Sequence, residues 1–229
     1  TCTDSHVLIP SYYNGTEVTR IATRAFYNCS SFTEITIPAT VRNIGTQIFY
    51  KCSNIHTVYY NGTYGNEDNP FLKAVNIKKV VFCGTYIPNS ILKDATNIKE
   101  VVIANGVTSI ASSAFSGCSG LISITIPDSV TSIGSSAFSN CWSLTNITIP
   151  DSITSIEYHA FSNCRSLTSI AIPDSVTSID SSAFYDCNSL KEIRFGGTKE
   201  QWNAIEKKGF WGSAINDLVI FCTNAERGE

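Results

Sequence analysis

Apolar residues recur along this chain with a repeat of 23 residues, most clearly in the copies that begin at Leu121, Leu144 and Leu167. The shared pattern is L-x-x-I-x-I-P-x-x-V-x-x-I-x-x-x-A-F-x-x-C. The two isoleucines before the proline alternate with polar residues, which predicts a short strand with one buried face. Proline lacks the N–H that a β-ladder needs, so it ends each strand and starts a turn toward a second inward-facing segment.

A single copy leaves both edges of its apolar strip uncovered, so it becomes stable only when copies stack on one another. The sequence therefore predicts a right-handed repeat solenoid. We expect a parallel β-sheet of about ten short strands on one face and short helical or irregular returns on the other. The predicted strands contain the apolar pairs Val7/Ile9, Ile35/Ile37, Val58/Tyr60, Val80/Phe82, Val101/Ile103, Ile124/Ile126, Ile147/Ile149, Ile170/Ile172, Ile193/Phe195 and Leu218/Ile220.

The repeats divide the chain into regular and irregular stretches of one solenoid, which we expect to span residues 1–229. Residues 61–97 are the least regular stretch, because Asn-Gly and Asn-Pro pairs in NGTYGNEDNP indicate a turn-rich insertion. The other predicted stretches are an N-terminal coil or cap at 1–20, regular repeats at 21–60 and 98–195, and a C-terminal cap at 196–229.

The C-terminal cap is expected to be helical and to cover the last coil. Thr198 and Gln201 form a capping-box pattern, which predicts a helix that runs to about Lys207. Trp202 and Trp211 supply apolar rings in the same stretch. Such rings can also stack on sugars, but their place at the end of the array favours a hydrophobic end-cap.

The A-F-x-x-C ending of the repeat resembles the bacterial leucine-rich repeats of the BspA-like type. The match covers residues 18–60 and 98–195 and is looser between 61 and 97. The resemblance implies a secreted or surface-displayed protein with a curved solenoid that contacts host proteins or other cells. The sequence departs from the pattern at Ala74 and Ala95, which stand where the repeat has cysteine.

The chain contains nine cysteines. Their repeat spacing, without any C-x-x-C pair, argues against zinc and predicts one thiol per coil. Stacked side chains run parallel to one another, so we expect reduced thiols buried in the core rather than disulfides. The predicted core column comprises Cys29, Cys52, Cys118, Cys141, Cys164 and Cys187. Three further cysteines lie outside it, and their pairing stays open: Cys2, Cys83 and Cys222.

The sequence offers no motif for catalysis, and we expect no enzyme activity, no cofactor and no metal. No pair of histidines among His6, His56 and His159 has ligand spacing. A column of aspartates could in principle hold calcium, but turn hydrogen bonding explains these residues more simply. They are Asp128, Asp151 and Asp174.

Composition narrows the partners further. Hydrophobic residues make up 43% of the chain and charged residues 15%, which is typical of a folded protein. A net charge of -3 without a basic stripe argues against nucleic acid. No apolar run approaches the roughly 20 residues that cross a bilayer, so we expect no membrane insertion. A start at Thr1 and the absence of methionine suggest a trimmed chain whose targeting signal has been removed.

The outward strand positions form an open sheet face, which is the surface that solenoids present to partners. The later coils place small polar residues there, whereas the central coils place apolar residues flanked by charge, which is typical of contact sites. Strand propensity alone is an alternative explanation. The candidate protein-binding residues are His56, Tyr59, Lys78, Lys79, Val81, Lys99, Glu100, Val102 and Ile122.

We therefore predict a non-enzymatic secreted or cell-surface solenoid that binds an extracellular or host protein. A passive spacer that only displays another domain is one alternative. A carbohydrate-binding module is another, with Trp142, Trp202 or Trp211 as the sugar platform.

Overall fold

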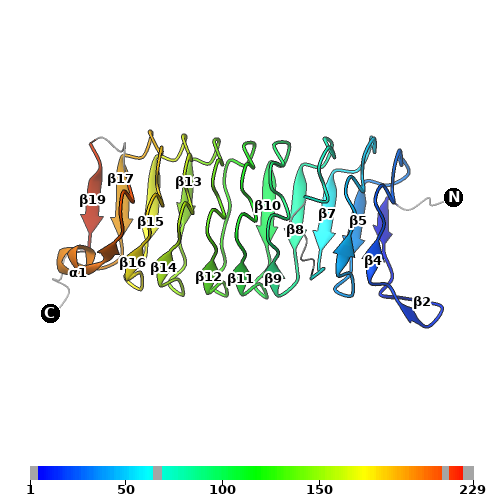
Figure 1. Ribbon diagram of the computed structural model, residues 1–229, viewed down its shortest axis with the longest axis horizontal. Coiled ribbons are helices and arrows are strands. Elements are labelled where there is room, and N and C mark those ends of the chain that lie inside the picture. The colour runs from blue at the N-terminus through cyan, green and yellow to red at the C-terminus, as the bar shows by residue number, and fades with distance from the viewer. Residues whose placement is uncertain (1–4, 64–68, 213–216, 224–229) are drawn as a thin grey trace.

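The computed structural model describes residues 5–63, 69–212 and 217–223 as an elongated stack of flattened coils (Figure 1). Parallel strands form a main ladder along the stack. Its first group is β1 (His6–Leu8), β5 (Glu34–Ile37), β7 (Thr57–Tyr60), β8 (Lys79–Phe82) and β10 (Glu100–Ile103). Its second group is β13 (Asn146–Thr148), β15 (Ser169–Ile172), β17 (Glu192–Phe195) and β19 (Val219–Cys222). The repeat therefore builds a parallel β-solenoid.

The alternation of apolar and polar residues fixes the register of the main ladder. Ile35 pairs with Val58, which pairs with Val80, so equivalent repeat positions lie side by side. These three side chains are fully buried. Because side chains alternate between the two faces of a strand, their neighbours point outward and form the open face.

The expected sheet of ten strands is not confirmed, because the main ladder is interrupted. Residues 121–127 form no strand, and the sheet divides there into groups of five and four strands. The inward side chains beside this gap are slightly exposed, with 7% for Ile103 and 6% for Ile124, against 1% for Ile170. We call residues 121–127 the seam.

The gap follows Gly120, where the next three copies have serine. A Cβ atom at this glycine would lie 2.4 Å from the Thr96 carbonyl oxygen. The chain thus enters the seam along a path that serine could not follow without a shift of the backbone.

The returns contain a second ladder of two-residue strands, which the sequence did not predict. Of the helical or irregular returns expected, the helical form is absent from the described residues, where the only helix is in the C-terminal cap. The second ladder comprises β4 (Arg20–Ile21) with β6 (Asn43–Ile44); β9 (Tyr86–Ile87), β11 (Ser109–Ile110) and β12 (Ser132–Ile133); and β14 (Ser155–Ile156), β16 (Ser178–Ile179) and β18 (Glu206–Lys207).

Turns with left-handed residues explain why the returns are not helical. Ser136 and Asn140 have φ angles of 58° and 60°, and most other coils repeat both positions. Every second N–H then points to the next coil, as when the Ser136 and Phe138 N–H groups donate to the carbonyl oxygens of Tyr158 and Ala160 at 2.9 and 2.8 Å. The returns therefore alternate between hydrogen bonds to the next coil and hydrogen bonds within the turn, as when the Ala137 N–H donates to the Gly134 carbonyl oxygen at 3.2 Å.

Aromatic rings stack on one another inside the returns, except where Leu92 holds the phenylalanine position and the contacts pass through Tyr60 and Phe82 of the strands. Phe138 stacks between Phe115 and Phe161 at centroid distances of 5.3 and 5.4 Å. At the C-terminal end, Phe184 meets the edge of Trp211 at 6.3 Å. Trp202 contacts Phe195 and is 8% exposed. Two of the three tryptophans thus cover the end of the core.

The C-terminal helix is shorter than expected. Helix α1 spans Lys199–Ala204, and Thr198 and Gln201 form the capping box. The chain then enters strand β18, in which Glu206 pairs with Ser178 of the preceding coil. Pairing with the second ladder therefore ends the helix before Lys207.

A hairpin projects from the N-terminal coil, where the sequence suggested only a coil or cap. Strands β2 (Tyr12–Tyr13) and β3 (Thr16–Glu17) are antiparallel. Asn14 and Gly15 join them with φ angles of 48° and 77°. Two left-handed residues in succession match the twist of a tight hairpin, and Asn-Gly is the usual pair there.

Candidate functional site

The open face carries a column of apolar side chains at its centre. Tyr59 pairs with Val81, and Val81 pairs with Val102, so the three residues occupy equivalent outward positions of β7, β8 and β10. Val102 is 37% exposed, and Ile122, in the seam, is 53% exposed. The structure thus brings the predicted apolar residues to one region of the face.

Tyr59 is less accessible to a binding partner than its outward position on the strand suggests. The His6 ring stacks on it at 5.2 Å with an angle of 18° between the rings. His6 is held by Thr36 Oγ1 at 2.8 Å and lies 3.6 Å from the Glu34 carboxylate. Tyr59 therefore packs within the N-terminal coils, and the exposed apolar surface lies further along, at Val102 and Ile122.

The predicted charged residues differ in whether their side chains already have a partner within the protein. Lys79 pairs with Glu100 at 2.6 Å, and this hydrogen bond raises the pKa of the lysine. The Lys78 ammonium donates to the Val75 carbonyl oxygen at 2.8 Å. His56 lies just before β7 rather than within it, and its Nδ1 is 2.9 Å from Thr57 Oγ1.

A cleft opens beside the exposed apolar residues, where the main ladder is interrupted. It has a volume of about 390 Å³ and lies between β10 and the seam. Glu100, Val102, Ser123 and Thr125 line it together with their backbone. Residues 123–126 form no backbone hydrogen bond to either neighbouring coil in the described structure, and Ser123, Ile124 and Thr125 line this opening.

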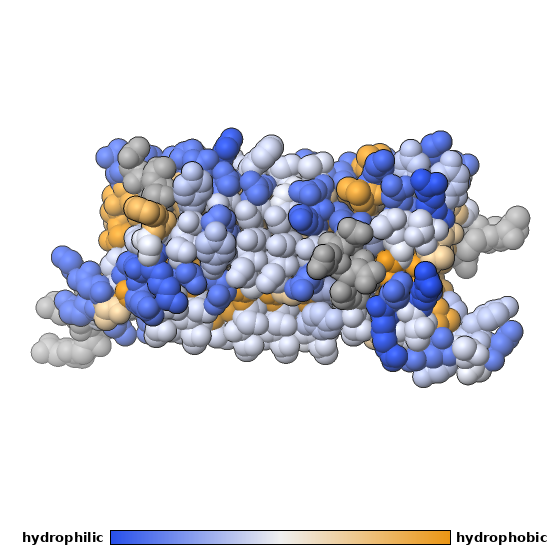
Figure 2. Space-filling model, in the orientation of Figure 1, coloured by the Kyte–Doolittle hydropathy of each residue, from blue (hydrophilic) through white to orange (hydrophobic). Residues whose placement is uncertain are grey.

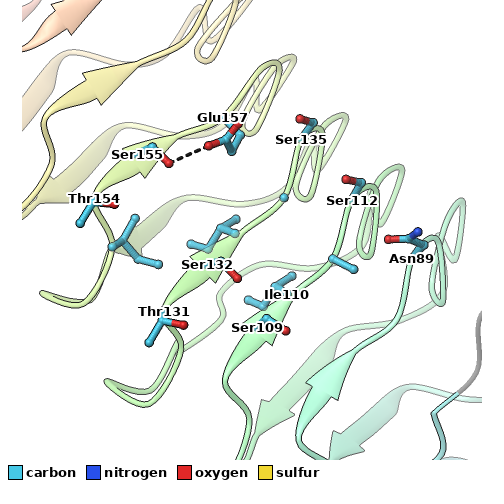
Figure 3. A pocket seen from close by; sticks show the side chains of 14 residues that line it. Asn89, Ser109, Ile110, Ser112, Thr131, Ser132, Ser135, Thr154, Ser155 and Glu157 are labelled. Atoms are coloured by element: carbon cyan, nitrogen blue, oxygen red, sulfur yellow. Dashed lines mark hydrogen bonds between the residues drawn. The ribbon is translucent and has the colours of Figure 1, made fainter.

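A second, polar groove of about 430 Å³ lies on the second ladder, between β12 and β14, which do not pair (Figure 3). Hydroxyl groups from successive coils line it, among them those of Ser109, Ser132 and Thr154. Ser155 donates to Glu157 at 2.6 Å. The residues that line the groove supply hydrogen-bonding groups but no aromatic ring, and the repeat pattern did not predict it.

The repeat cysteines form a column inside the returns. Each of five thiols donates to the carbonyl oxygen that lies 26 residues earlier, at distances between 2.8 and 3.2 Å. Burial raises the pKa of these thiols, and most strongly that of Cys141 and Cys164. Neutral thiols are poor nucleophiles and poor metal ligands, so the column is structural. The donors are Cys52, Cys118, Cys141, Cys164 and Cys187.

The other cysteines lie in different surroundings. Cys29, at the start of the column, is only half-buried. Cys83 is exposed and Cys222 half-buried, and all eight described cysteines are free. Cys2 lies outside the described residues.

Metal-binding chemistry finds no support in the described part of the chain, where no three histidine, cysteine or acidic side chains gather. Asp128, Asp151 and Asp174 are exposed and sit in the turns that follow the strands. His159 lies in a return turn and stacks on Tyr158 at 4.0 Å. No helix among the described residues is long and apolar enough to cross a membrane.

This architecture defines a parallel β-solenoid of the leucine-rich-repeat class. A model of the BspA type leucine rich repeat region matches six copies over residues 9–122 and 85–217. The chain therefore belongs to the BspA-type leucine-rich-repeat family. No curated protein matches the chain.

Solved structures of bacterial leucine-rich-repeat proteins are similar to this chain. A protein from Bacteroides ovatus is 25% identical over 95% of this chain and 63% of its own, with a TM-score of 0.49. TpLRR from T. pallidum is 22% identical over 85% of this chain and 74% of its own, with a TM-score of 0.45. A leucine rich cell surface protein from Faecalibacterium prausnitzii is 20% identical over 88% of this chain and 90% of its own, with a TM-score of 0.33.

Proposed function

We propose that this protein is a secreted or cell-surface solenoid that binds another protein through the open face around β10 and the seam. The observation that carries the proposal is the pair of exposed apolar side chains, Val102 and Ile122, beside a cleft in the sheet. Family membership supports a repeat protein of the bacterial surface type. Solenoids of this kind are generally not enzymes.

The open face changes along the axis in a way that favours this region. Thr148 and Ser169 represent the coils that follow the seam, where small polar side chains remain hydrated at little cost, although the last strand exposes Val219 and Phe221. Val102 and Ile122 instead expose apolar surface, whose removal from water favours a complex. Apolar patches appear elsewhere too, over the C-terminal coils and near β7 and β8, while the middle coils are mostly near neutral (Figure 2).

Charged groups around the patch favour a protein partner over an unspecific apolar contact. Lys99 is exposed, and the Lys79–Glu100 pair lies next to Val102. Charges at the rim of an interface steer the approach and fix the orientation of the partner. Backbone groups in the cleft supply further hydrogen-bonding positions.

The alternatives differ in what they require. A passive spacer needs no binding surface on this face. A sugar platform at Trp202 or Trp211 has little support, because these rings pack against Phe195 and Phe184. Trp142 is 50% exposed, with the Arg165 guanidinium 5.9 Å from its ring.

The test is a double variant, Val102→Ser with Ile122→Ser, measured against a panel of purified extracellular matrix and serum proteins by biolayer interferometry. Leu72→Ser is the matched control, because Leu72 is an apolar residue 43% exposed on the returns. We expect the double variant to lose at least about tenfold in affinity for the captured protein while the control binds normally. Equal binding by both variants would refute this face, and no binding by the wild type would favour the spacer.

A further inference from the structure

Three cations converge on one tyrosine ring at the N-terminal end of the returns. The ring of Tyr50 has the charged groups of Arg24, Lys51 and Lys73 each 5.8 Å from its centroid. The three cations belong to three successive coils and are all exposed. We call these four residues, with Tyr27, the basic ridge.

The backbone fixes the direction of these side chains. Arg24, Lys51 and Lys73 are left-handed residues of the return turns, with φ angles of 57°, 63° and 66°. Gln47 accepts hydrogen bonds from the Arg24 guanidinium at 3.3 and 3.2 Å. The cations are therefore presented outward by turns that the coil stack holds in place.

Tyr27 extends the ridge with an aromatic surface. Its ring is 47% exposed and lies 5.9 Å from that of Tyr50. Lys51 lies 5.7 Å from the Tyr27 ring as well. An exposed ring next to converging cations offers both an apolar platform and positive charge.

The cations of the ridge have no carboxylate partner in the described part of the chain. The contrast is Arg165, which also approaches an aromatic ring but pairs with Asp186 at 3.3 Å. Three like charges around one ring repel one another, and the π faces offset only part of this. An anion bound among them would relieve the repulsion. The ridge is also a local excess of positive charge on a chain of net charge -3.

We propose that the basic ridge binds an anionic polysaccharide, with sulfate or carboxylate groups beside Arg24, Lys51 and Lys73 and a sugar ring against Tyr27. Successive coils are about 4.8 Å apart, close to the length of one sugar unit, so a glycan along the axis would meet one cation after another. A nucleic acid would need a longer basic stripe than this one. The site is separate from the open face and does not depend on the protein-binding proposal.

The test is surface plasmon resonance of the full chain on immobilised heparin oligosaccharide, with Lys51→Gln/Lys73→Gln as the variant. The matched control is Lys78→Gln/Lys99→Gln, which removes the same charge from the open face. We expect saturable binding that weakens about tenfold or more in the ridge variant and little in the control. Raising the salt concentration should weaken it further. Thermal unfolding of both variants checks that the fold is intact.

Competition experiments separate the possible sources of the anion. Hyaluronan oligosaccharide carries carboxylate without sulfate, and competition by it as well as by heparin would support a polysaccharide site of either anion. Inorganic tripolyphosphate carries charge without sugar, and equal competition by it would overturn the polysaccharide assignment. Equal loss in the ridge and control variants, or no saturable binding by the wild type, would overturn the site itself.

Discussion

The thiol column predicts a specific loss of stability at alkaline pH, and Cys187 is the best position to measure it. Its side chain is fully buried, and its S–H donates to the Phe161 carbonyl oxygen at 3.0 Å. Burial is the main cause that raises the pKa of this thiol to about 12. Cys187→Ala removes the hydrogen bond and the burial of one sulfur atom, worth about 1 kcal/mol each. The variant should therefore be about 2 kcal/mol less stable at pH 7.

The sign of the pH dependence follows from the two pKa values. In the unfolded chain a cysteine ionises near a pKa of about 8.5, whereas the folded state keeps this thiol neutral until about pH 12. The stability that this group contributes is thus fully present below about pH 8.5 and is lost as the pH rises toward 12. At about pH 10 the ionisation of this thiol in the unfolded chain has lowered the free energy of unfolding of the wild type by about 2 kcal/mol. The alanine variant has no thiol at this position and loses nothing by this route.

The assay is urea denaturation followed by circular dichroism, at several pH values between neutral and about pH 10 in reducing buffer. The difference in free energy of unfolding between the wild type and Cys187→Ala isolates this thiol, because both chains share every other titrating group. We expect the difference to fall from about 2 kcal/mol to near zero. Cys187→Ser keeps a donor without an ionising thiol, so its stability should follow the pH dependence of the alanine variant. A difference that stays constant would refute a buried neutral thiol.

Three further predictions test the packing of the coils. Gly134→Ala should lower the free energy of unfolding by at least about 2 kcal/mol, because the added Cβ would lie 2.6 Å from the Ser112 backbone nitrogen. Gly106→Ala adds its Cβ in open space and should change it by less than about 0.5 kcal/mol, so equal effects in chemical denaturation would contradict the coil spacing. Phe138→Ala should cost about 3–5 kcal/mol in the same measurement, because the ring stacks on both sides; a cost below about 1 kcal/mol would contradict the stack. Amides of residues 123–126 should exchange with deuterium faster than those of β13, and equal protection would show that the seam is closed.

The repeat period was enough to predict the main ladder and its register. The second ladder was missed because its strands have two residues, such as Ser132–Ile133, and two residues carry no alternation to recognise. The N-terminal hairpin could have been predicted, since Asn14 and Gly15 are a strong turn signal. The seam could not be predicted, because its ISITIP segment has the same pattern as copies that form strands. The early end of the helix arises from Glu206 pairing with another coil.

Alternation also placed Tyr59, Val81 and Val102 in one column, since a fixed register leaves no other arrangement. Their exposure could not be predicted in the same way, because His6 reaches Tyr59 across two coils. The basic ridge did leave a signal in the sequence. Lys51 and Lys73 occupy equivalent repeat positions in the returns, outside the strands that form the usual contact face of a solenoid.

The open-face site lies where the chain lacks a hydrogen bond that links neighbouring coils in the regular copies. Just before the main strands, the Thr145 hydroxyl donates to the Ile122 carbonyl oxygen at 3.3 Å, and the Thr168 hydroxyl donates to Thr145 at 3.2 Å. These hydroxyl groups already donate to the neighbouring coil, so they are not free to donate to a binding partner. Lys99 and Ile122 hold the same repeat position without that bond, and their side chains extend outward instead. Because the consensus residues at this position hold neighbouring coils together, we expect the residues that contact a partner in copies that depart from the consensus.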